Sequence, residues 1–229
     1  MDGFSATLPQ PERRLARRLE GFGDIVFGFA VSQCALQLPR RGNTVELGHP
    51  RDLLLYFVTF ALLASLWLTY HRMMNGAFRP TRIDMFLAFS FLAFVSLIPF
   101  GMYAIGHTGG DSLAEARTAI ASYSGLYAVM SAIAAVISAR NLARGRSHCT
   151  AEECDGMWVG EVRGAALFTC MSAACAGDLA FGPAWSSIAF FLIFPVVALT
   201  RRRFPHAPPS AGLRAVLAAN RRAASPSRR

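Results

Sequence analysis

Long apolar stretches constrain the fold of this chain more than any other feature. Six of them approach the roughly 20 residues that a helix needs to cross about 30 Å of hydrocarbon. The chain is 53% hydrophobic and only 16% charged, whereas about 25% of the residues in a typical soluble domain are charged. Because lipid cannot hydrogen-bond an open backbone, such stretches must be helical. The sequence therefore predicts an all-α, polytopic membrane protein with six transmembrane helices.

The apolar stretches divide the chain into three parts. A polar, basic leader covers residues 1–17, the membrane domain covers 18–203, and a basic tail, expected to be disordered, covers 204–229. We expect the helices at about residues 18–38, 52–70, 85–105, 118–139, 157–176 and 179–200. The fifth is the least apolar, because Glu161 and Arg163 lie in its first half.

Arginines set the predicted orientation. The formal net charge is +9, and all 23 basic residues are arginine. With six spans, 19 of the 23 fall on the side of the two termini, and the positive-inside rule places that side in the cytoplasm. We therefore expect a multi-pass protein of the plasma (inner) membrane with both termini cytoplasmic. The arginines gather at helix ends and do not alternate with aromatic residues, so no nucleic-acid partner is expected.

The first apolar stretch, residues 18–38, carries more polar groups than a lipid-facing helix tolerates. Asp24 lies near its start, and Ser32, Gln33 and Gln37 lie further in. Polar groups within a membrane are costly unless they face protein or water. This pattern predicts that the first helix lines a pore and that the other helices hold it in place.

Four short motifs occur in the order of a known family. Arg18-x-x-x-Phe22-Gly23-Asp24 resembles the Arg…Phe-Ser-Asp signature of the lysosomal potassium channel, transmembrane protein 175, and its bacterial relatives, with glycine in place of serine. The other three motifs are Trp67-x-x-x-His71-Arg72, Arg82-x-Asp84 and Leu97-Ile98-Pro99-Phe100. The resemblance spans roughly residues 13–140 and reaches the last two helices only as a pattern of apolar stretches.

This resemblance implies a bacterial-type six-helix subunit that forms a homotetramer, with the first helix of each subunit lining the pore. It implies passive conduction of monovalent cations, potassium at most favoured, with no cofactor and no partner besides lipid and further copies of the chain. In the family, bulky apolar side chains of the first helix narrow the path. The matching positions are Phe29, Gln33 and Leu36, which share a helical face, although Phe29 replaces an isoleucine and Gln33 an apolar residue.

The remaining signature residues are expected to organise helix packing rather than to line the path. They are Arg18, Phe22, Gly23, Asp24, Trp67 and His71.

Two other functions fit the same residues. A proton- or ion-coupled secondary transporter would use Asp24 as a relay, and a non-conducting membrane scaffold would use the Gln33 face to join subunits. No enzyme is expected, because the apolar stretches hold few acid, base or nucleophilic groups. No metal site is expected either, because His148, Cys149 and Cys154 lack the usual spacing and a second ligand pair.

Overall fold

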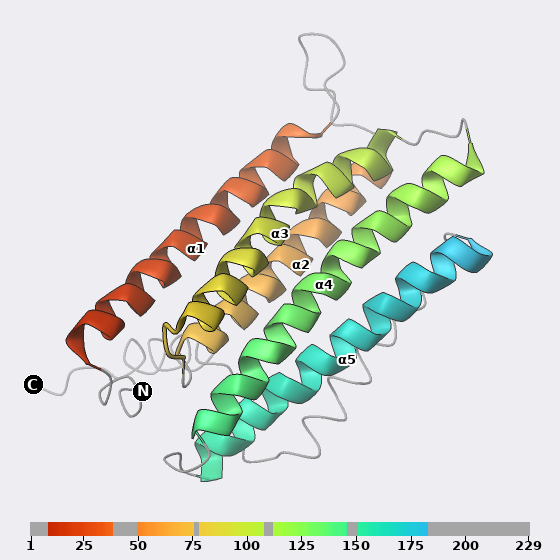
Figure 1. Ribbon diagram of the computed structural model, residues 1–229. Helices are drawn as coiled ribbons and strands as arrows, with labels where there is room; N and C mark the ends of the chain where they lie inside the picture. Colours follow the sequence, from red (N-terminus) through yellow and green to blue (C-terminus); the bar gives the residue numbers. More distant parts are fainter. Residues whose placement is uncertain (1–8, 39–49, 76–77, 108–111, 146–150, 183–229) are drawn as a thin grey trace, which may run out of the picture.

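The computed structural model describes residues 9–38, 50–75, 78–107, 112–145 and 151–182. This part of the chain is all-α, and helices that follow one another in the sequence run antiparallel (Figure 1). The helices are α1 (Gln10–Leu36), α2 (Pro50–Asn75), α3 (Arg82–His107), α4 (Leu113–Gly145) and α5 (Ala151–Phe181). Each contains a segment long and apolar enough to cross a membrane. The prediction of an all-α, multi-pass membrane protein is therefore confirmed for the described residues.

The helices extend beyond the predicted spans at most of their ends. α1 begins at Gln10, inside the predicted leader, because the leader is rich in helix-forming Arg, Leu and Ala. Pro11 lies in its first turn, where a missing N–H costs nothing. Among the later helices, α5 continues to Phe181, across the break between the predicted helices 157–176 and 179–200. Residues 179–181 thus belong to α5, whereas residues 183–200 of the predicted sixth helix and the tail lie outside the described residues.

An aromatic core joins the first three helices. Tyr70 of α2 stacks on Phe91 of α3 with ring centroids 6.0 Å apart, and Phe27 of α1 lies 6.0 Å from the Tyr70 ring. α4 packs on α3, and α5 packs mainly on α4. The core therefore holds the inner face of α1, at one edge of the bundle, against α2 and α3.

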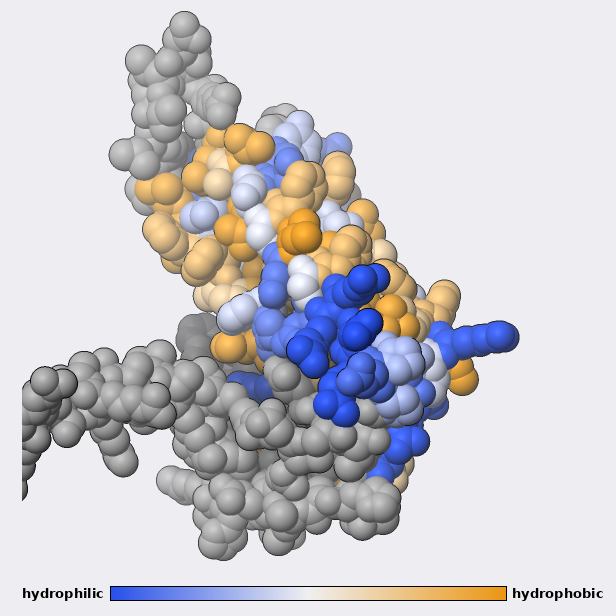
Figure 2. Space-filling view, turned by 90° about the vertical axis from the view of Figure 1, so that its left-hand side faces the viewer, coloured by the Kyte–Doolittle hydropathy of each residue, from blue (hydrophilic) through white to orange (hydrophobic). Residues whose placement is uncertain are grey.

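The two ends of the bundle differ strongly in charge. The starts of α1 and α3 and the ends of α2 and α4 meet at one end, which we call the basic end. Its described arginines are Arg13, Arg14, Arg17, Arg18, Arg72, Arg79, Arg82, Arg140 and Arg144. On the side formed by α1, hydrophilic residues gather at this end below a broad apolar surface (Figure 2). At the opposite end, the starts of α2 and α4 carry Arg51 and Arg117.

Candidate pore face and signature network

One side of α1 has no cover from the other helices that the structure describes. Ile25, Phe29 and Leu36 are 70%, 59% and 57% exposed, and Ser32 is exposed as well. With 100° per residue these four side chains fall within an arc of about 60°, which we call the outward face. The opposite side of α1 is buried against its neighbours. With respect to the described residues, the outward face is therefore open to lipid or to another copy of the chain.

The structure divides the three residues predicted to line a pore. Phe29 and Leu36 lie on the outward face, whereas Gln33 is half-buried at its flank, about 60° from Leu36 around the helix. Ile25 and Ser32 share the outward face and were missed, although helical spacing from Phe29 would have pointed to both. The Ser32 hydroxyl donates to the Gly28 carbonyl, 2.8 Å away, and its oxygen can still accept a hydrogen bond.

A polar network docks α2 onto α1. The Trp67 Nε1–H donates to Asp24 Oδ1 over 2.8 Å, and His71 Nε2 lies 2.9 Å from the same oxygen. His71 Nδ1 lies 2.8 Å from Glu20 Oε1. The imidazole therefore sits between two carboxylates one helical turn apart, and a doubly protonated ring can donate to both. The structure thus brings Asp24, Trp67 and His71 together and adds Glu20, which its four-residue spacing from Asp24 could have revealed.

Gly23 provides the space into which Tyr70 packs. A Cβ atom at Gly23 would lie 2.7 Å from Cζ of the Tyr70 ring, far closer than packing allows. The Tyr70 hydroxyl donates to the Leu19 carbonyl over 2.7 Å. The glycine at the serine position of the signature is therefore matched to the tyrosine of α2.

The other two signature residues lie outside this network. Phe22 makes an edge-on contact with Phe89 of α3, with ring centroids 6.0 Å apart. Arg18 is exposed at the basic end. By helical spacing it lies in line with the outward face.

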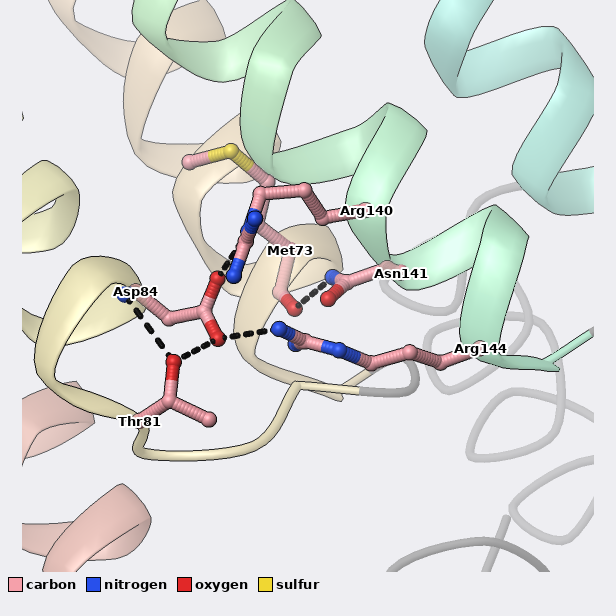
Figure 3. A network of polar contacts seen from close by, with 6 residues as sticks. All are labelled: Met73, Thr81, Asp84, Arg140, Asn141 and Arg144. Carbon is pink, nitrogen blue, oxygen red and sulfur yellow. Dashed lines mark hydrogen bonds and ion pairs between the residues drawn. The ribbon is translucent and has the colours of Figure 1, made fainter.

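A second polar cluster joins α3 and α4 at the basic end (Figure 3). Asp84 of α3 is fully buried. Its Oδ1 accepts from Arg140 Nε and its Oδ2 from Arg144 Nη2, each over 2.6 Å. The Thr81 hydroxyl also donates to Oδ2 and accepts from the Asp84 backbone N–H. Asp84 of the motif Arg82-x-Asp84 therefore pairs with arginines of α4, whereas the Arg82 side chain is exposed.

The same end ties α4 to α2. Asn141 Nδ2 donates to the Met73 carbonyl over 3.0 Å (Figure 3). The Asp84 cluster and the Asn141–Met73 hydrogen bond together fix the relative positions of α2, α3 and α4.

No group of three or more His, Cys, Asp or Glu side chains within the described residues fits a metal ion. His148 and Cys149 lie outside the described residues.

Residues 18–99 match the family model described as "Endosomal/lysosomal potassium channel TMEM175". This stretch contains the outward face of α1, the signature network and most of α3. The family resemblance predicted from the motifs is thereby confirmed. No curated protein sequence matches the chain.

Two solved structures share the fold. The first is the crystal structure of a variant of the potassium channel MtTMEM175 with a nanobody fusion protein. It has a TM-score of 0.64 and 14% identity, and the match covers 81% of this chain and 91% of that one. The second is a lysosomal potassium-selective channel TMEM175 homologue from Chamaesiphon minutus, with a TM-score of 0.61 and 16% identity, covering 82% and 98% of the two chains. The family and both structural neighbours are ion channels, not enzymes.

Proposed function

We propose that this chain is an integral-membrane cation channel in which four copies of α1 turn their outward faces toward a central, water-filled path. The observation that carries the proposal is the uncovered outward face on the helix that bears the family signature. Among the described helices, α2 and α3 pack on the other side of α1, and Ser32 makes the uncovered side less suited to lipid than an all-apolar face. Four such faces around an axis would cover one another and leave a narrow passage.

Ions would move passively down their gradient through this passage. Rings of Ile25, Phe29 and Leu36 would form apolar constrictions that control the path by dewetting. The oxygen atoms of Ser32, and of Gln33 at the flank, would replace part of the hydration shell of a monovalent cation. A pore of this kind needs no cofactor and favours potassium at most weakly.

The signature network would set the position of α1 in this assembly. Asp24 is bound by Trp67 and His71, so α1 is held to α2 near the basic end. By the positive-inside rule this end faces the cytoplasm, which corresponds to a plasma-membrane protein with a cytoplasmic N-terminus. The six-helix, tetrameric form is what the resemblance implies.

A flux measurement tests the proposal. The purified protein is reconstituted into liposomes or a planar bilayer with potassium on one side and sodium on the other. We expect cation current without any coupled substrate. The reversal potential should lie at zero or be shifted slightly toward the equilibrium potential of potassium. An intact, correctly inserted protein that passes no cation would contradict the proposal and favour the scaffold.

The clustering of Asp24, Glu20 and His71 keeps an ion-coupled transporter as the second candidate, because carboxylates and imidazole can relay protons. Asp24→Asn separates the two functions. A transporter would lose coupling, whereas a channel would keep passive flux. Trp67→Phe is the matched control, since it removes a hydrogen bond to Asp24 but no titratable group.

A further inference from the structure

Two guanidinium groups share one buried carboxylate where α3 begins and α4 ends. Arg140 and Arg144 are both partly exposed, while Asp84 is fully buried between them. Within the described residues 71–75, 78–86 and 137–145, Asp84 is the only acid. Arg140 and Arg144 carry two positive charges against the single negative charge of Asp84, so this cluster keeps a net positive charge.

The two arginines keep unused hydrogen-bond donors. Arg140 binds Asp84 through Nε alone, so its two Nη groups have no hydrogen-bond partner among the described residues. Arg144 binds through Nη2, and its Nη1 is buried with no partner in the same part of the chain. Asp84 thus fixes both side chains while leaving several donors free. A site held in place in this way loses less conformational entropy when it binds an anion.

The position of the pair suits a ligand that comes from the membrane. The apolar spans of α3 and α4 end at this cluster. Val129 and Val136 form an exposed apolar stripe on α4, and Arg140 follows Val136 by one helical turn on nearly the same face. An acyl chain lying along the two valines would carry its phosphate to Arg140 and Arg144.

We propose that Arg140 and Arg144, held by Asp84, bind the phosphate headgroup of an anionic phospholipid. Guanidinium groups bind phosphate through paired, charge-assisted hydrogen bonds, and basic sites between membrane helices at the cytoplasmic face suit anionic headgroups. This site lies on α3 and α4, away from the outward face of α1, and does not depend on whether the chain conducts.

Native mass spectrometry of the purified protein with phosphatidylglycerol and, separately, phosphatidylcholine tests the site. We expect preferential retention of phosphatidylglycerol and about tenfold weaker binding in Arg140→Gln, as the loss of a charge-assisted hydrogen bond implies. Arg140→Lys keeps the charge and the pairing with Asp84 but loses the planar fork, so it should bind with intermediate affinity. Because Arg140→Lys conserves the ion pair with Asp84, it still tests the site if Arg140→Gln does not fold.

Arg82→Gln is the matched control, because it removes the same charge at the same end from an exposed side chain outside the cluster. It should change phosphatidylglycerol binding by less than about twofold, as expected for an exposed, solvent-screened charge. Equal losses in Arg82→Gln and Arg140→Gln would overturn the site, because binding would then follow the overall charge of this end. Equal retention of phosphatidylcholine, or displacement of the lipid by inorganic phosphate at comparable concentration, would overturn the lipid headgroup as the ligand.

Discussion

At the scale of single residues, Gly23 shows how one missing Cβ decides helix packing. The Tyr70 ring occupies the place that any side chain at position 23 would take. The family's serine at this position and the tyrosine at position 70 therefore exclude each other in this packing. From the sequence alone only the replacement of serine by glycine was visible, because the partner of Gly23 lies on another helix.

Gly23→Ala should destabilise the protein by about 1–3 kcal/mol, the usual cost of overpacking a filled core. Gly21→Ala is the control within the same helix, because nothing lies within 4 Å of its added Cβ. Alanine at that site should leave the protein unchanged or stabilise it by up to about 1 kcal/mol. Thermal unfolding in detergent measures both, and equal melting temperatures would show that Tyr70 does not pack at Gly23.

Glu161 of α5 precedes the apolar span Gly164–Phe181. Its Oε2 is buried without a hydrogen-bond partner in the described part of the chain. Burial raises the pKa of this carboxyl above its ordinary value of 4.5. The folded state therefore binds this proton more tightly than the unfolded state does, and ionisation at neutral pH destabilises the fold.

Glu161→Gln should accordingly raise the melting temperature at pH 7.5. The gain over the parent should shrink as the pH falls through the raised pKa and vanish below pH 4.5, where the parent carboxyl is protonated in both states. Glu115→Gln, at an exposed position of α4, should show no such trend. If the gain in melting temperature is constant across this pH range, the pKa of the Glu161 carboxyl is not raised by burial.

At the scale of helices, the Asp84 cluster fixes the start of α3 to the end of α4. Removal of one partner from a buried ion pair leaves uncompensated charge and typically costs about 3–5 kcal/mol. Asp84→Asn should therefore lower the free energy of unfolding by roughly this amount. Glu115→Gln, which also changes an acid in the first turn of a helix, should cost no more than about 1 kcal/mol. Chemical denaturation of both variants measures the difference, and similar values would show that the cluster does not hold the two helices together.

α1 carries a second prediction at this scale, because Gln33 flanks the outward face. Gln33→Leu should reduce cation flux severalfold, since the lining loses an amide oxygen and becomes more apolar. Gln37→Leu is the control, because Gln37 lies at the C-cap, just past the last helical residue. Liposome flux assays compare the two, and unchanged flux in a well-expressed Gln33→Leu protein would remove Gln33 from the path.

The sequence predicted the helices better than their ends. Apolar length located all five described helices, because the membrane requires about 20 such residues in each. The described helices begin earlier than predicted, and all but α1 end later. Polar helix-forming residues continue α1 and α4 beyond their apolar segments. α5 likewise runs through residues 177–181, across the break between the fifth and sixth predicted helices.

At the scale of the whole molecule, the family motifs pointed to residues that organise helix packing but not to their contacts. Asp24, Trp67 and His71 were grouped from their motifs, and the structure brings them together. Arg140 and Arg144 were assigned only to orientation, because their pairing with Asp84 spans long sequence separations that no local pattern encodes. Ile25 and Ser32 were missed because the positions were counted from the family's motif rather than from the exposed side of this helix.

The proposed assembly rests on the same uncovered face. Four copies that meet through α1 would bury the outward face, whereas the exposed side chains of α2 would stay in lipid. Phe29 of α1 and Phe57 of α2 make this difference testable, because they are the same residue type and nearly equally exposed in one chain, at 59% and 62%.

The most direct test of this account is the potassium flux of Phe29→Ala compared with that of Phe57→Ala in reconstituted liposomes. If the outward face of α1 lines the path, Phe29→Ala widens an apolar constriction and raises the flux severalfold, while Phe57→Ala leaves it near the parent value. Equal flux in the two variants, at equal expression and insertion, would contradict the account.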